Sequence, residues 1–348
     1  MPIIKIEKVY QRYLKTLPWA VENLNLEVES GEILTILGPS GCGKTTILRL
    51  IAGFERPDIG RIFVNGDLVA GDGVWTPPEH RGIGMVFQDY ALFPHLTVEE
   101  NIGFGLHRLN VEQRRERITE VLNLIDLIKY RSRYPFELSG GQQQRIALAR
   151  ALAPSPVVIL LDEPFSNLHA DLRIQMRQDI HDILRRSKTT AIFVTHDQEE
   201  AFHIANRVVV MNHGLLEQID TPEKIYHTPL SKFVAEFVGQ ADFLPGIMKA
   251  GQVVTEVGTF NTPQSLPEGE EVEMMFRPDD IDIFPDEEGE GVIIARRFNG
   301  PENVYTLSLP SGQTLHSIQP SIALLRIGAR VRITAIPDYV VVFPLERA

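Results

Sequence analysis

The sequence is poor in cysteine and contains no long apolar run. A single cysteine, Cys42, among 348 residues excludes an internal disulfide framework and a zinc site built from several cysteines. No apolar run approaches the roughly 18–20 residues that a membrane-spanning helix needs. The charged start MPIIKIEKVYQRY lacks the apolar core of a secretory signal. We therefore expect a protein of the reducing cytosol.

An excess of positive charge is also missing. The 34 Lys and Arg residues are outnumbered by 46 Asp and Glu, which gives a net charge of −12. This balance argues against a general binder of phosphate backbones, so nucleic acid is not expected as a partner. Residues 241–348 alone carry −8, with 16 acidic and 8 basic side chains. The change in composition predicts a domain boundary near residue 240.

In the first 240 residues, apolar runs alternate with stretches of helical spacing. Residues 3–9 and 24–28 alternate apolar and polar positions, as half-buried strands do. Further strands are predicted at 33–38, 82–88, 156–164 and 189–196, and helices at 45–52, 111–129 and 173–186. This alternation indicates an α/β domain with a mainly parallel sheet over residues 1–240.

Residues 241–348 follow a different pattern. Short apolar segments such as VVTEV, EVEMMFRP, GVIIARRF and RVRITAI are separated by Gly, Pro and Asp, and no long helical spacing occurs. The pattern predicts a small all-β barrel or sandwich.

The segment GPSGCGKTT follows the predicted strand 33–38 and opens a predicted helix. It matches G-x-x-x-x-G-K-[ST], a loop whose backbone N–H groups surround phosphate oxygens, and the helix N-terminus adds partial positive charge. Lys44 is predicted to reach the β- and γ-phosphates of ATP, and Thr45 to offer its hydroxyl to Mg²⁺. The predicted nucleotide-binding residues of the loop are Gly38, Pro39, Ser40, Gly41, Cys42, Gly43, Lys44, Thr45 and Thr46.

Polar residues also end three other predicted strands. Asp162 ends a buried strand, where an unpaired carboxylate is costly, so we predict that it holds Mg²⁺, with a helix cap or surface charge as the alternative. Glu163 follows and is predicted to polarise the attacking water. His196 and Gln88 each end a strand of the same sheet, where open α/β folds bind ligands. Taken alone, either side chain would be interpreted as structural.

A second glycine-rich motif, LSGGQ, lies nearly a hundred residues after the phosphate loop. Its residues Ser139, Gly140 and Gly141 are predicted to leave backbone N–H groups free at a helix start, an anion site that no nearby residue uses. Near the N-terminus, Tyr13 is placed either to stack on adenine or to pack near a sheet edge.

The ordered set of Tyr13, the phosphate loop, Gln88, LSGGQ, Asp162–Glu163 and His196 resembles the nucleotide-binding subunit of an ATP-binding cassette (ABC) transporter over about residues 1–240. In that family LSGGQ faces the γ-phosphate of ATP held by the other subunit of a head-to-tail dimer. The resemblance thus predicts a homodimer in which four residues serve the partner's ATP, namely Ser139, Gly140, Gly141 and Gln142.

The same resemblance implies roles for the strand-end residues. Glu163 is the expected general base, His196 holds the γ-phosphate, and Asp162 serves Mg²⁺. Gln88 contacts Mg²⁺ and the water, and its loop senses integral membrane permease subunits. Residues 89–101 resemble the surface on which such a subunit docks, with core packing as the alternative reading of Leu92, Phe93 and Leu96. The family's Ser-x-Leu-Asp loop reads Ser166-Asn167-Leu168-His169 here, so cross-talk between the two sites is expected to differ.

FRPDDIDIF at 276–284 resembles the start of the accessory domain of importers for sugars, polyamines, molybdate and ferric iron. The expected fold is therefore a P-loop ABC ATPase domain, 1–240, followed by an all-β, OB-like regulatory domain, 241–348. Overall likeness at 9–28 and 295–312 favours the ferric-iron importers, served indirectly by a periplasmic solute-binding protein. The expected location is the cytoplasmic face of the inner membrane. A soluble translation or repair ABC ATPase is disfavoured because the chain has one cassette and no heptad run.

Overall fold

The structure is a computed structural model that describes residues 1–166 and 170–345. Contacts divide the chain into two compact units, Met1–Pro222 and Glu223–Ala348. The sequence boundary predicted at 240/241 lies between the last helix and the first strand of the second unit. No helix among the described residues is both long and apolar enough to cross a bilayer.

The first unit is built around a six-stranded sheet in which four of the five pairings are parallel, as the alternation of strands and helices predicted. The fifth pairing, at one edge of the sheet, is antiparallel. Across the sheet the strands are β11 (Leu215–Asp220), β10 (Arg207–Asn212), β3 (Ile33–Leu37), β9 (Thr190–Thr195), β8 (Val158–Asp162) and β7 (Ile83–Val86). β3 and β9 are buried along their whole length, which explains their apolar sequences.

A second, antiparallel sheet belongs to the same unit. Its order is β2 (Val21–Val28), β1 (Ile4–Gln11), β4 (Ile59–Val64), β5 (Asp67–Gly71) and β6 (Val74–Trp75). Strands β4 to β6 were not predicted, because their polar and exposed positions give little apolar signal. Together with helix α1 (Lys44–Ala52), this sheet buries one face of the parallel sheet.

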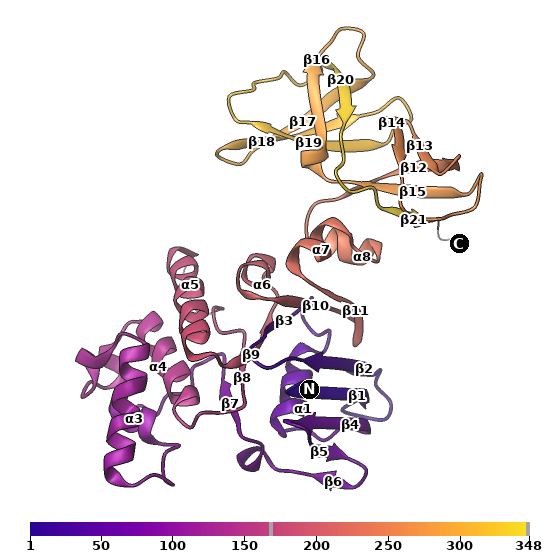
Figure 1. The fold of residues 1–348 in the computed structure, drawn as a ribbon. Coiled ribbons are helices and arrows are strands. Elements are labelled where there is room, and N and C mark those ends of the chain that lie inside the picture. The colour runs from indigo at the N-terminus through magenta and orange to yellow at the C-terminus, as the bar shows by residue number, and fades with distance from the viewer. Residues whose placement is uncertain (167–169, 346–348) are drawn as a thin grey trace. The chain divides into compact units, whose positions relative to one another are not determined.

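The remaining helices cover the opposite face of the parallel sheet, as Figure 1 shows for α3 to α5. They are α2 (Val98–Gly103), α3 (Val111–Leu124), α4 (Gly140–Leu152), α5 (Ala170–Ser187) and α6 (Gln198–Ile204). The helix predicted at 111–129 ends earlier, at Leu124. Asp126 has a left-handed φ of 57°, which an α-helix cannot continue through.

The second unit contains two short helices and two five-stranded antiparallel sheets. The helices are α7 (Pro222–His227) and α8 (Lys232–Phe237). One sheet has the order β14 (Gly258–Asn261), β13 (Gln252–Thr255), β12 (Asp242–Lys249), β15 (Glu271–Phe276) and β21 (Val342–Pro344). The other has the order β16 (Ile281–Pro285), β20 (Arg330–Ala335), β17 (Gly291–Phe298), β18 (Glu302–Ser308) and β19 (Thr314–Pro320). One apolar core joins the two sheets.

Candidate functional site

The carboxyl ends of the central strands meet at one edge of the parallel sheet. Leu37 of β3 is in register with Thr195 of β9, and Asp162 of β8 is in register with Val194. The phosphate loop therefore begins beside the residues that follow β8 and β9. The structure brings together the sequence-predicted groups of these three strands, at the edge where open α/β sheets bind ligands.

The phosphate loop is shaped by glycines that no other residue could replace without strain. Gly43 has a φ of 107°, and a Cβ there would lie 2.1 Å from the Ala20 carbonyl oxygen. A Cβ on Gly38 would lie 2.5 Å from the Met211 oxygen and 2.6 Å from the Cys42 Sγ. The loop can thus turn its backbone inward only because these side chains are missing.

Lys44 lies inside the curve of the loop. Its side chain is buried, and its Nζ donates to the carbonyl oxygens of Gly38, at 2.8 Å, and Pro39, at 2.9 Å. These two bonds offset part of the cost of burying the ammonium group.

Thr45 and Asp162 form a pair between α1 and β8. The Thr45 hydroxyl donates to Asp162 Oδ1 over 3.2 Å. Burial is the main cause that raises the pKa of Asp162 above its usual range, and the Thr45 hydrogen bond opposes it. A hydroxyl and a partly buried carboxylate at this spacing form an oxygen donor set of the kind that suits Mg²⁺.

Glu163 and His196 form the second pair of the site. Glu163 Oε1 lies 3.2 Å from His196 Nδ1. The Glu163 backbone has a φ of 42°, rare for a residue with a Cβ, and its N–H donates to Val194 O over 3.0 Å. The imidazole is 55% exposed and the carboxylate 24%, so both groups face the edge of the sheet.

Tyr13 lies against the phosphate-loop helix. Its hydroxyl is 2.9 Å from Thr46 Oγ1, and the side chain is about half exposed. The side chain thus lies exposed beside the loop, and its stacking on adenine stays a prediction.

The LSGGQ segment begins helix α4, as predicted, but one of the three amides that were expected to be free, that of Ser139, is engaged. Ser139 N–H donates to Gln142 Oε1 over 3.0 Å, and Gln142 N–H donates to Ser139 Oγ over 3.4 Å, a reciprocal cap. The expectation of a free Ser139 amide is therefore wrong for this conformation. In the described part of the chain, only Gly140 and Gly141 of the motif donate no backbone hydrogen bond.

Gln88 follows β7, the strand that pairs with β8. Its strand, β7, ends at Val86, two residues earlier than predicted, and Gln88 is exposed. A cavity of about 890 Å³ opens beside the segment that follows, lined by Phe87, Phe93, Phe104 and Arg150 among others.

The residues of segment 89–101 differ in their packing. Leu92 packs on the main core, as the alternative reading expects. Phe93 lines the cavity, and its ring centroid is 4.4 Å from that of Phe104 with the two rings tilted, so docking of a membrane subunit here stays a prediction. Arg150 on α4 donates to the carbonyls of Tyr90 and Ala91. The sequence analysis missed both Phe104 and Arg150, because nothing in α4 marks Arg150 as a partner of a distant loop. Asn167, Leu168 and His169 lie outside the described residues.

Comparisons with known proteins agree with this geometry. Residues 21–166 match the family described as ABC transporter, and residues 257–343 match the TOBE domain. The spermidine/putrescine import ATP-binding protein PotA of Lawsonia intracellularis is 41% identical, over 99% of this chain and 98% of that protein. The Fe(3+) ions import ATP-binding protein FbpC of Photorhabdus laumondii is 46% identical, over 70% of this chain and 68% of that protein.

Among solved structures, the dimeric post-hydrolysis state of the ATP-binding cassette MJ0796 bound to ADP and Pi is 31% identical. It covers 63% of this chain and 98% of that one, with a TM-score of 0.54. The α/β cassette fold and the all-β C-terminal domain predicted from the sequence are thus confirmed. The chain therefore belongs to the family of ATP-binding subunits of ABC importers, as an ABC ATPase that carries a C-terminal TOBE domain.

Proposed function

We propose that this protein is the ATP-hydrolysing motor of a polyamine importer, acting as a homodimer on partner membrane subunits. The observation that carries the catalytic part is the meeting of Lys44, the Thr45–Asp162 pair and the Glu163–His196 pair at one sheet edge. These groups supply a phosphate-binding cation, a metal-binding oxygen pair and a base beside an imidazole.

In the proposed reaction, each pair has a separate task. Lys44 exchanges its bonds to two carbonyls for the β- and γ-phosphates of ATP. Glu163 accepts a proton from the attacking water, and His196, 3.2 Å from it, donates a hydrogen bond to the γ-phosphate. Both side chains are fixed by the ends of neighbouring strands, which places them before the substrate arrives.

Mg²⁺ fits the oxygen pair at the end of β8. Thr45 Oγ1 and Asp162 Oδ1 would hold it. Burial raises the pKa of Asp162, and a bound cation would favour the ionised carboxylate. A cation held by these two oxygens would supply positive charge that offsets the negative charge developing on the phosphates. Gln88, which follows the neighbouring strand β7, is proposed as a further contact of the cation and of the attacking water.

The second copy of the chain would complete the site. Gly140 and Gly141 offer two amides at the start of α4, where partial positive charge favours an anion. Dimeric MJ0796 is a precedent for pairing of such cassettes. Ser139 and Gln142, which cap each other, would orient these amides toward the partner's ATP.

The cavity beside segment 89–101 is the proposed contact with the membrane subunits. Its aromatic lining suits an apolar helix end, and Arg150 fixes the loop at Tyr90 and Ala91. Such docking would place the protein on the cytoplasmic face of the membrane, with a solute-binding protein as an indirect partner.

Polyamine is proposed as cargo in preference to ferric iron. The likeness to PotA extends over 99% of this chain, through both units. The likeness to two FbpC proteins covers 70% and 87% of this chain and supports iron as the second candidate. The cassette itself does not contact the cargo in either case, so the choice must be tested by transport.

The test is uptake of labelled spermidine and of labelled ferric iron by the source cells lacking this gene. We expect wild type to restore spermidine uptake and Glu163→Gln to fail, with ATP turnover reduced at least about a hundredfold in the purified variant. Glu116→Gln, an exposed carboxylate on α3, is the matched control and should behave as wild type. Restoration of iron uptake alone would reverse the cargo assignment, and normal turnover by Glu163→Gln would remove the base role.

A further inference from the structure

His196 stands between two residues whose polar groups are tied into one network. The Thr195 hydroxyl donates to Glu200 Oε2 over 2.5 Å and accepts from the Asp197 N–H over 3.0 Å. The Glu200 N–H donates in turn to Asp197 Oδ1 over 3.2 Å. His196 itself is mostly exposed, with Glu163 as its side-chain partner. The network therefore holds the chain on both sides of His196, from which the imidazole reaches Glu163.

One arginine of α5 faces this network. Arg177 is 7% exposed, and its Nη2 donates to Asp197 Oδ2 over 3.1 Å while Nη1 donates to Glu199 Oε2 over 3.1 Å. Glu200 Oε1 is 3.8 Å from Nη2. Arg173, one turn earlier, adds a longer bond of 3.4 Å to Asp197 Oδ2. The planar fork of Arg177 thus spans two carboxylates that a lysine could not reach together.

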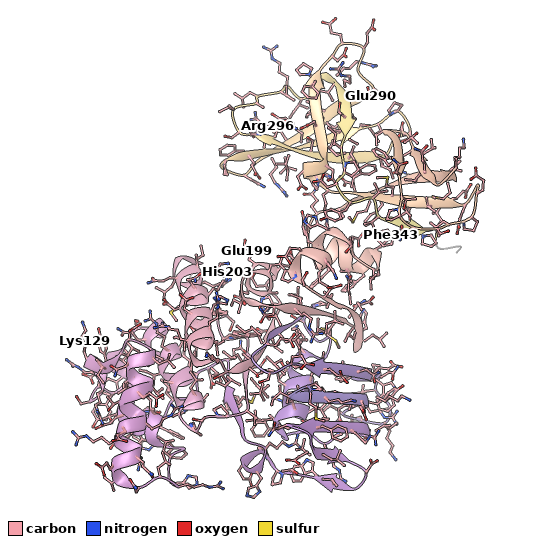
Figure 2. The ribbon with its side chains drawn as sticks, viewed as in Figure 1. Lys129, Glu199, His203, Glu290, Arg296 and Phe343 are labelled. Carbon is pink, nitrogen blue, oxygen red and sulfur yellow. The ribbon has the colours of Figure 1, made fainter. Side chains whose placement is uncertain are left out.

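The contact between α5 and α6 continues beyond this cation. Glu199 and His203 lie on α6 beside α5, as Figure 2 shows, and His203 Nε2 is 3.1 Å from Gln178 Oε1. Burial raises the pKa of the Glu200 carboxyl, and the nearby Arg177 guanidinium opposes this shift by favouring the ionised form. Several hydrogen bonds therefore hold the loop of His196 and helix α6 against α5, and the bonds of Arg177 are the most buried of them.

Helix α5 also touches the LSGGQ helix. A Cβ on Gly141 would lie 2.8 Å from Met176 Sδ, so this glycine packs closely against α5. Asp179 accepts from Arg145 Nη2 of α4 over 2.6 Å. Helix α5 therefore contacts two functional segments. Met176 and Asp179 contact the helix that begins with LSGGQ, and Arg177 contacts the loop of His196.

We infer that Arg177 is a positioning residue for ATP hydrolysis, which holds Asp197 and thereby keeps His196 directed toward Glu163 and the γ-phosphate. This inference rests on the role proposed above for His196. Arg177 contacts neither nucleotide nor water in this scheme. Loss of the guanidinium should lower turnover through a misdirected imidazole, while the separate contacts of the phosphate loop keep ATP binding.

The test compares four variants of the full-length chain: Arg177→Met, Arg177→Lys, Asp197→Asn and, as control, Ile180→Ala. Ile180 is fully buried on α5, and its truncation destabilises the same helix without removing any bond to Asp197. We expect Arg177→Met and Asp197→Asn to lower kcat about tenfold or more with the KM for ATP within about twofold. Arg177→Lys should lie between these and wild type. The Tm of Ile180→Ala should fall at least as far as that of Arg177→Met, and its kcat should stay within about twofold of the wild-type value.

A double variant separates positioning from general damage. Arg177→Met combined with Asp197→Asn should lower kcat no further than either change alone, because both act through one contact. The inference about Arg177 would be overturned if kcat fell as far in Ile180→Ala as in Arg177→Met, or if kcat were normal in Asp197→Asn. Either result would leave the proposed role of His196 in place. Normal turnover by His196→Gln would instead overturn the proposed role of His196, and the inference with it.

Discussion

At the scale of single residues, the rate at which the Cys42 thiol is alkylated reports on the packing of the phosphate loop. The thiol is 3% exposed within the phosphate loop, and burial raises its pKa. Since only the thiolate reacts, alkylation by a maleimide should be slow at pH 7 and should rise up to about tenfold for each pH unit until the raised pKa is reached. Mass spectrometry of the intact chain measures the rate, and saturating ATP should slow it.

The alkylated protein should lose ATP turnover, because Sγ lies against Gly38 and leaves no room for an added group. Cys42→Ser serves as the control and should keep turnover in the presence of the reagent. Rapid labelling that does not depend on pH, or full turnover after complete labelling, would contradict this account of the loop.

The residues of the site differ in how far the sequence could predict them. Lys44 and Thr45 lie in a contiguous motif, and Asp162 ends an apolar run, so local pattern was sufficient to place them at the sheet edge. The free amide expected at Ser139 was wrong because a side chain three residues later folds back on it. Arg177 carried no signal, since its partners lie some twenty residues away on another helix.

At the scale of elements, α1 depends on an arginine from outside it. Arg81 is 3% exposed, and its guanidinium donates to Leu50 O and Ile51 O, at the end of α1, and to Thr76 O. Burial lowers the pKa of Arg81 to about 10, so it stays protonated at neutral pH. Arg81→Met should lower the free energy of unfolding by about 3 kcal/mol, because buried carbonyls lose their donors.

Urea denaturation followed by tryptophan fluorescence measures this loss. Both tryptophans, Trp19 and Trp75, belong to the first unit, so the signal reports the unit that contains α1. Arg61→Met is the control, because Arg61 is about half exposed and pairs with Glu7 on the surface; its loss should be below about 1 kcal/mol. Equal losses in the two variants would refute the capping role.

Elements with continuous apolar sequences were predicted well, and those with mixed burial were not. β3, β8 and β9 differ from their predicted bounds by one or two residues, because four to six buried positions in a row leave no alternative. β12 was missed: only alternate positions are buried, and Pro245 and Gly246 interrupt the run. Pairing with β15 stabilises it against its own weak propensity.

At the scale of the whole molecule, composition and contacts divide the chain at different residues. The acidic shift begins near 240, yet α7 and α8 group with the second unit. Arg277 of the FRPDD segment accounts for this. It is 3% exposed and donates to the carbonyl oxygens of Tyr226, Ala235 and Gln240, with its guanidinium 4.3 Å from the Tyr226 ring centroid. A change in composition cannot reveal these hydrogen bonds, because all of them are made by a single side chain.

Hydrogen exchange in the full-length chain tests whether Arg277 holds these helices. Arg277→Met should raise the exchange rate of amides in 223–240 by about a hundredfold, equivalent to about 3 kcal/mol of lost local stability. Exchange in the parallel sheet should stay unchanged. Arg296→Met, at an exposed position of β17, is the control. Unchanged protection of 223–240 in Arg277→Met would mean that apolar packing of Ala235 against Met275 and Phe343 suffices to hold the helices. The FRPDD segment would then serve only to connect β15 to β16, and would not hold the two helices.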